Sequence, residues 1–196
     1  GIKPEGDNLW PYTFTKQGKP AGRTNPDIYG DLFIAHGLQE YAKAKGNEQY
    51  WDMAKDIMLR RMKLYDSPDY SLANTRNMKA PRINGHWMIF LNLSNQMLEM
   101  KSDPEVEAVA ARCVDAIMNY HFNPDFGLIN EIINHDMSRN PETAQYSYTG
   151  HACETLWMVM QEALRKKDRA LFNLAAERFR RHVEVCHDDV YGGWFR

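Results

Sequence analysis

The sequence has few cysteines and none of the short motifs that mark a cofactor or metal site. Its three cysteines, Cys113, Cys153 and Cys186, form no CxxC pair and lie in apolar surroundings, so we expect reduced core thiols of a cytoplasmic protein. No Gly-x-Gly-x-x-Gly or Gly-Lys-Ser/Thr loop is present, which leaves nicotinamide and nucleotide chemistry without support. No His-x-x-x-His or His-Glu-x-x-His spacing occurs either, so we expect neither a metal nor another cofactor.

A large excess of one charge is also absent. The 24 Lys and Arg and the 26 Asp and Glu are interspersed and sum to a net charge of -2, which argues against nucleic acid or an anionic membrane as partner. No apolar run approaches the length of a membrane span. The start of the sequence shows neither a signal peptide nor a methionine, so we expect a processed or cut N-terminus. With 196 residues, 43% of them apolar, the chain can bury a sizeable core and bind a small molecule.

Apolar periodicity predicts six helices arranged in three pairs. Asp27 is a plausible cap for the first helix, Gly46-Asn47 are its stop, and Asp168 is a plausible cap for the last helix. The third helix is apolar nearly all round, which indicates a buried helix. A polar, turn-rich span over residues 66–85 separates the first pair from the second. The expected helices cover residues 27–45, 48–65, 87–100, 104–122, 148–166 and 168–187.

Three aromatic segments that resemble one another lie between the helix pairs. Residues 7–14, 123–131 and 188–195 each indicate a turn that leads into a short extended piece. The chain is therefore a repeat array, and we expect its helices to stack in one curved layer with the turns gathered at one end. Three helical hairpins cannot close a toroid, so we expect further repeats, a homodimer or a complementing segment to cover the open flank.

One helix start combines three side chains of chemical interest. His151, Glu154 and Trp157 are spaced i, i+3 and i+6, so they share one helix face. An imidazole one turn from a carboxylate, beside an aromatic ring on which a sugar can stack, is what proton transfer on a carbohydrate requires. The alternative is a helix start with a buried histidine and a core tryptophan.

The pattern Gly150-His151-x-x-Glu154-x-x-Trp157 resembles the corresponding segment of the N-acylglucosamine 2-epimerase family. Other parts of the chain resemble the same family in the same order along the sequence. They are residues 10–20, 27–42, 127–131 and 191–195. The family folds as an (α/α)6 barrel and is about twice this long. The resemblance therefore implies an all-α fold, about half a toroid, with residues 1–196 forming a single segment of a longer chain.

The resemblance also implies a chemistry. Family members carry out 2-epimerisation or aldose–ketose isomerisation with two histidines and an arginine, and only the histidine of the Gly-His-x-x-Glu motif falls inside these residues. We therefore expect a sugar 2-epimerase of the N-acylglucosamine/N-acylmannosamine type, in which His151 exchanges the proton at C2. Glu154 would orient the imidazole or bind a hydroxyl group; the alternative is a capping-box carboxylate. Cellobiose epimerases carry a histidine where Leu128 stands, which favours N-acylhexosamines, and Thr149 replaces a usual proline.

Further side chains are candidates for sugar binding, each with a structural alternative. Glu131 could instead pair with Arg139 or Arg82, aromatic side chains on helices are often core residues, and loop arginines are often solvated. His86 is a candidate second participant in proton transfer, or else a helix cap. The candidates are Glu131, Asn130, Trp157, Tyr29, Arg23, Arg82 and His86.

Two other classes of protein compete with an epimerase. A noncatalytic sugar-binding or protein-binding α/α domain would account for the missing second histidine. A glycoside hydrolase would need two facing carboxylates, for which Glu131 and Glu154 are the candidates.

Overall fold

The computed structural model describes residues 8–11, 13–21, 27–70 and 78–195. These residues are mainly helical, with two small two-stranded sheets, which confirms the all-α class and the α/α type of the fold. The chain divides into two compact units, Gly1–Ala80 and Pro81–Arg196.

The first unit contains a helical hairpin. Helix α1 (Tyr29–Lys45) packs against α2 (Glu48–Tyr65), as the periodicity predicts. Gly46 ends α1 in the left-handed conformation, with a φ of 63°, which glycine adopts without steric cost. Asn47 then caps α2 by accepting a hydrogen bond from the Gln49 backbone N–H. The Gly46-Asn47 stop is therefore confirmed.

A buried ion pair, which the sequence analysis did not anticipate, holds this hairpin together. Asp31 of α1 lies 2.7 Å from Arg61 of α2, and both side chains are buried. The same carboxylate accepts a hydrogen bond from the Trp10 backbone N–H at 2.9 Å. Burial raises the pKa of Asp31, and the bonds to Trp10 and Arg61 oppose that rise. The pair thus links α1 and α2 to Trp10 of the first aromatic segment, and Phe14 at the end of that segment forms an antiparallel bridge with Pro20.

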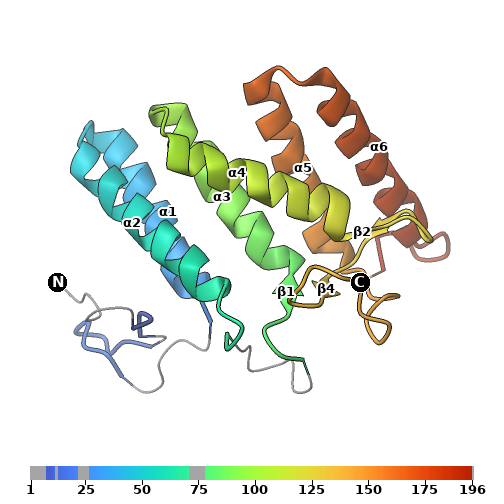
Figure 1. Cartoon of the computed structure of the whole chain (residues 1–196), viewed down its shortest axis with the longest axis horizontal. Helices are drawn as coiled ribbons and strands as arrows, with labels where there is room; N and C mark the ends of the chain where they lie inside the picture. The colour runs from blue at the N-terminus through green and yellow to red at the C-terminus, as the bar shows by residue number, and fades with distance from the viewer. Residues whose placement is uncertain (1–7, 12, 22–26, 71–77, 196) are drawn as a thin grey trace. The chain divides into compact units, whose positions relative to one another are not determined.

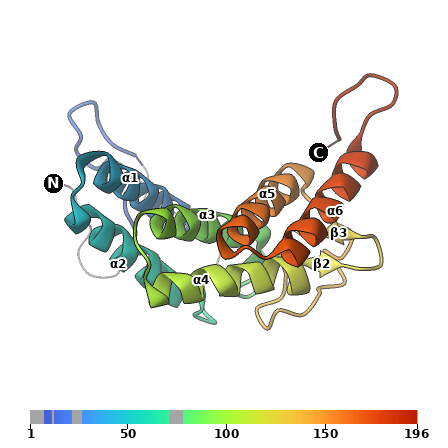
Figure 2. The ribbon, with the colours of Figure 1, turned by 90° about the horizontal axis from the view of Figure 1, so that it is seen from above.

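The second unit contains the other two helix pairs. Helix α3 packs against both α4 and α5, and α5 packs against α6 (Figure 1, Figure 2). Helix α3 begins three residues earlier than predicted, and the predicted 104–122 helix ends in a wider π-helical turn, η1. Asp103 and Asp168 cap α4 and α6 through their side chains. The bounds are α3 Asn84–Met100, α4 Pro104–Asp115, η1 Ala116–Tyr120, α5 Thr149–Lys166 and α6 Arg169–Cys186.

Two short antiparallel sheets join the helices of this unit. Strand β2 (Phe122–Asn123) pairs with β3 (Leu128–Ile129), and His187 forms a bridge with Trp194, so both aromatic segments contain the expected extended pieces. Strand β1 (Arg82–Ile83) pairs with β4 (Ile132–Ile133). This second pairing was not predicted, because the span before α3 indicated only turns. It places the start of α3 beside the segment that leads to α5.

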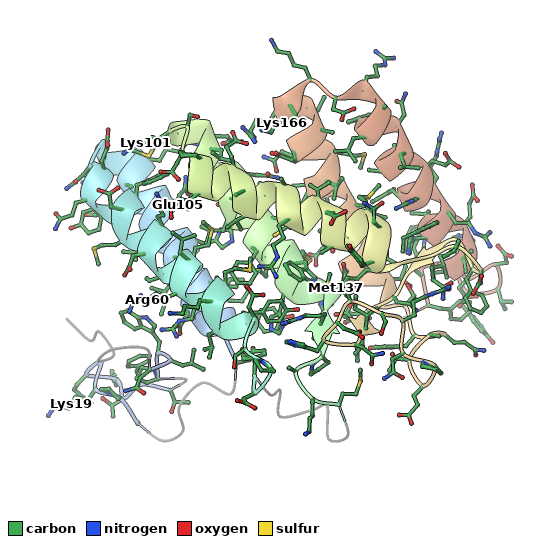
Figure 3. All side chains as sticks on the ribbon, viewed as in Figure 1. Lys19, Arg60, Lys101, Glu105, Met137 and Lys166 are labelled. Carbon is green, nitrogen blue, oxygen red and sulfur yellow. The ribbon has the colours of Figure 1, made fainter. Side chains whose placement is uncertain are left out.

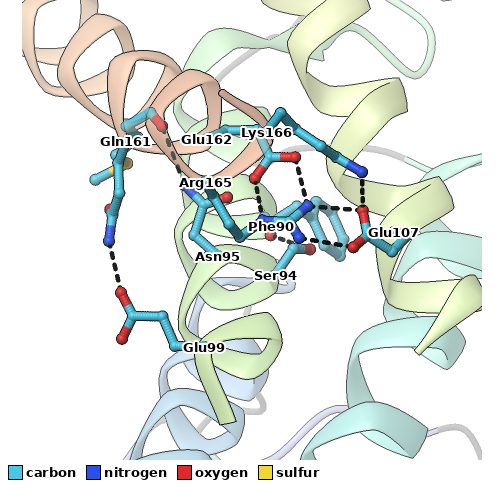
Figure 4. Close-up of polar contacts among 10 residues, drawn as sticks. Phe90, Ser94, Asn95, Glu99, Glu107, Gln161, Glu162, Arg165 and Lys166 are labelled. Carbon is cyan, nitrogen blue, oxygen red and sulfur yellow. Dashed lines mark hydrogen bonds and ion pairs between the residues drawn. The ribbon is translucent and has the colours of Figure 1, made fainter. Parts of the chain in front are cut away.

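At the end of the unit where α3 and α5 finish, charged side chains join α4 to α5. Lys101 and Lys166 lie at that end of the unit, whereas Met137 lies at the end where α3 and α5 begin (Figure 3). Arg165 of α5 forms ion pairs with Glu107 of α4 at 2.6 Å and with Glu162 of α5 at 2.7 Å, and Lys166 also contacts Glu107 (Figure 4).

Candidate active site

Glu131 lies at the start of α3 with its backbone fixed on both sides. Its carbonyl oxygen accepts a hydrogen bond from Asn84 N at 2.8 Å, and its own N–H donates to the Tyr146 carbonyl at 3.0 Å. The carboxylate atom Oε1 accepts from Gly85 N at 3.4 Å. The first residues of a helix expose unpaired N–H groups and a partial positive charge, and Ile83 provides no side-chain cap here. The carboxylate of Glu131 therefore takes the place of a cap for α3.

The same carboxylate binds His151, which lies in the first turn of α5. Glu131 Oε1 and His151 Nδ1 are 2.9 Å apart. Because an ionised carboxylate only accepts hydrogen bonds, Nδ1 carries the ring proton in this pair. The other ring nitrogen, Nε2, has no hydrogen-bond partner among the described residues. The His151 side chain is 32% exposed and that of Glu131 is 7% exposed, so a buried carboxylate orients a ring that a ligand can reach.

Two neighbours support the His151 ring and backbone. The ring of Tyr148 packs edge-on against the imidazole, with 4.3 Å between the ring centroids. The hydroxyl of Thr155 donates to the His151 carbonyl at 2.6 Å and accepts from Asn84 Nδ2 at 3.0 Å. Neither neighbour, nor Asn84, is among the candidates from the sequence. Nothing in the sequence marks Asn84 and Thr155 as partners, because Asn84 falls in the predicted turn-rich span and a threonine inside a helix commonly bonds the carbonyl four residues before it.

Glu154 and Trp157 occupy the exposed side of α5. Glu154 makes no hydrogen bond or ion pair within the described part of the chain, and the carboxylate that contacts the imidazole is Glu131. Glu154 is also too far into α5 for a capping box, since Tyr148 is the N-cap residue. Trp157 is 43% exposed, so it is available for stacking and is not a core residue.

Asn130 and Arg82 are buried in contacts with the polypeptide itself. The Asn130 side chain donates to the Ala144 carbonyl at 2.8 Å, which secures the loop before α5. Arg82 contacts the ring and the backbone carbonyl of His135 at 2.9 and 3.4 Å. Arg139 pairs with Asp125 at 2.9 Å. Glu131 is therefore paired with a histidine and not with Arg139 or Arg82.

His86 follows Gly85 in the first turn of α3 and is fully buried. Burial, together with the charges of Arg82 and His151, lowers the pKa of His86 to about 3. The ring is consequently neutral at physiological pH and is a weak base. This environment does not favour His86 as the second proton carrier.

The remaining candidates are Tyr29 and Arg23. Tyr29 belongs to α1 in the first unit, where its ring stacks on Phe33. Arg23 lies outside the described residues.

A hollow of about 380 Å³ lies at the same end of α5, a volume within the range of small-molecule sites. It is lined by aromatic and small residues, namely Tyr148, Thr149, Gly150, Cys153, Val183, Trp194 and Phe195. Over the described ranges, no group of three or more His, Cys, Asp or Glu side chains is placed to hold a metal ion. Nor does any described helix have the length and apolar character needed to cross a membrane.

No protein-family model matches this sequence, and no curated protein matches it. Several solved structures do. The match to a D-mannose isomerase covers 100% of this chain and 54% of the isomerase chain, with a TM-score of 0.73 and 12% identity. A cellobiose 2-epimerase from Bacillus thermoamylovorans matches 95% and 51%, with a TM-score of 0.74 and 13% identity. A sugar epimerase from a ruminal bacterium matches 98% and 53%, with a TM-score of 0.77 and 13% identity.

A glycoside hydrolase of family 76, from a bovine Bacteroides thetaiotaomicron strain, matches 91% of this chain and 40% of its own. Its TM-score is 0.64 at 11% identity. At such identities the likeness establishes the fold alone. The chain spans about half the length of the first three structures.

Proposed function

We propose that this chain is part of a sugar epimerase or isomerase in which His151 exchanges the proton at C2 of a ring-opened sugar. The observation that carries the proposal is the contact between Glu131 Oε1 and His151 Nδ1 at 2.9 Å. It leaves Nε2 as the nitrogen that can take a proton. The solved structures of sugar isomerases and epimerases support the proposal at the level of the fold.

The chemistry requires a positioned base and a means of stabilising negative charge. A proton next to a carbonyl group is too weakly acidic for water to remove it quickly, and the resulting enediolate must be stabilised. His151 Nε2 would remove the C2 proton, and Glu131 would hold the imidazolium that forms. Exposed Glu154 and Trp157 would contact the sugar, through its hydroxyl groups and its ring face.

Inversion at C2 needs a second proton carrier on the opposite face of the sugar. We place it in a part of the polypeptide outside these 196 residues, because the weakly basic His86 does not suit that role. We also propose N-acylhexosamines as substrates, since Leu128 stands three residues before Glu131 where cellobiose epimerases have a histidine.

The test is the fate of sugars incubated in D₂O with the longest natural polypeptide that contains this chain. The sugars are N-acetylmannosamine, N-acetylglucosamine, D-mannose and cellobiose. The reaction of each sugar is followed by ¹H NMR. The proposal predicts loss of the C2 proton signal and formation of the C2 epimer or the ketose. Released monosaccharide without C2 exchange would instead indicate a glycoside hydrolase, and sugar binding without any reaction would indicate a noncatalytic domain.

A further inference from the structure

One buried residue contacts Glu131 directly and reaches His151 through Thr155. Asn84, the first residue of α3, is fully buried. Its backbone N–H donates to the Glu131 carbonyl at 2.8 Å. Its side-chain amide donates to Thr155 Oγ1 at 3.0 Å, and the Thr155 hydroxyl donates to the His151 carbonyl at 2.6 Å.

We infer that Asn84, acting through Thr155, is a positioning residue that sets the distance between Glu131 and His151; the inference deepens the proposed function and rests on it. The two partners lie on different segments, 20 residues apart in sequence. The bond from the Glu131 N–H to the Tyr146 carbonyl joins their backbones just before α5, and Asn84 adds a link from the start of α3 to Thr155 within α5. Asn84 binds the Glu131 segment through its backbone N–H and α5 through its side-chain amide. Both bonds therefore start from the same residue at the beginning of α3.

The consequence for the imidazole is a matter of geometry. Hydrogen bonds weaken steeply when the donor and acceptor move apart or lose their alignment. If the first turn of α5 shifts away from α3, the Nδ1–H to Oε1 bond lengthens and no longer selects one tautomer of the neutral ring. A base whose Nε2 is protonated for part of the time cannot accept the C2 proton during that time.

A simple role in packing α3 against α5 is the competing explanation, and the chain contains a matched control for it. Asn95 is also a buried asparagine of α3, and its amide also donates to α5, at the Met158 carbonyl with a distance of 3.0 Å. Asn95 lies three turns further along α3, away from His151. Removing either amide should lower the melting temperature to a similar extent, but only the removal of Asn84 should affect the imidazole.

The experiment records ¹⁵N chemical shifts of the histidine rings in the 196-residue chain at a pH where the His151 ring is neutral, with His151→Asn identifying its signals. The variants are Asn84→Ala, Thr155→Val, Thr155→Ser and Asn95→Ala. We expect the Nδ1–H tautomer in the parent chain and an approximately tenfold shift of the tautomer ratio in Asn84→Ala and Thr155→Val, since a hydrogen bond to a charged group is lost. Thr155→Ser keeps the hydroxyl and should keep the parent ratio, as should Asn95→Ala.

Thr155→Val keeps the β-branched shape of the side chain and removes only the hydroxyl, so it provides a second test if Asn84→Ala does not fold. An unchanged tautomer ratio in Thr155→Val, or an equal shift in Asn95→Ala, would overturn the inference. A shifted ratio, together with no C2 exchange in the longest natural polypeptide that contains this chain, would support the positioning role and refute the epimerase. Where exchange occurs, Thr155→Val should lower kcat about tenfold with little change in KM.

Discussion

The ion cluster between α4 and α5 holds the helix that carries His151, and its contribution to stability can be worked out from Glu107. Bonds to Arg165 and Lys166 lower the pKa of Glu107 from 4.5 to about 2, although burial opposes the change. A shift of that size corresponds to about 3 kcal/mol of stability at neutral pH. The side chains of Glu107 and Arg165 are 25% and 23% exposed, so solvent screening reduces the expected value to about 1–2 kcal/mol.

The sign of the pH dependence follows from the direction of the shift. Because the pKa of Glu107 is lower in the folded chain than in the unfolded chain, the stabilisation is complete above about pH 5 and is lost as the pH falls toward 2. We therefore expect Glu107→Gln to destabilise the chain by about 1–2 kcal/mol at pH 7 and by progressively less below pH 5.

Urea unfolding, followed by circular dichroism between pH 7 and pH 3, measures both quantities. Asp115→Asn is the matched control, because Asp115 also belongs to α4 but is exposed and accepts its hydrogen bond from the uncharged Asn119 side chain, at 2.6 Å. A Glu107→Gln variant as stable as the parent at pH 7 would refute the reasoning. So would a difference that stays constant from pH 7 to pH 3.

Three further outcomes are expected. Burial lowers the pKa of His121 to about 4, so below about pH 6.5 the unfolded chain binds a proton that the folded chain does not. Stability should therefore fall as the pH decreases from about 6.5 to 4. His121→Phe should flatten this slope, whereas the control His187→Asn should not. An unaltered slope in His121→Phe would contradict this. Glu131→Gln should slow C2 exchange by about tenfold to a hundredfold, because the imidazolium loses its charged partner; an unaffected rate would exclude an orienting role. The 196-residue chain alone should exchange C2 protons far more slowly than a longer polypeptide that encloses the site, and equal rates would show that these residues suffice.

The helices and their ends follow from local sequence, which is why they could be predicted. The bounds of α2 agree with the apolar periodicity, and Gly46 and Asp168 end or begin helices through contacts with their near neighbours. The early start of α3 at Asn84 and the β1–β4 pairing depend on contacts between residues about 50 positions apart. Such contacts leave no periodic signal in a single sequence.

The site was predicted in part for the same reason. The sequence nominated both Glu131 and His151, because each belongs to a segment that resembles a known family. It offered Glu154, one helical turn away, as a residue that orients the imidazole or binds a hydroxyl group, whereas in the structure the carboxylate at the imidazole is Glu131. Helical spacing identifies residues on one face of a helix, but it contains no information on a carboxylate that arrives from another segment.

The most direct test of the account is the rate of C2 proton exchange in His151→Asn, measured in D₂O by ¹H NMR with a substrate that the parent polypeptide converts. Asparagine cannot accept the proton, so we expect the rate to fall by about a hundredfold to ten-thousandfold while sugar binding changes little. His187→Asn removes an exposed histidine paired with Asp189 and should exchange at the parent rate. If His151→Asn retains exchange within about tenfold of the parent, His151 is a structural residue of the α5 start and the proposed site is wrong.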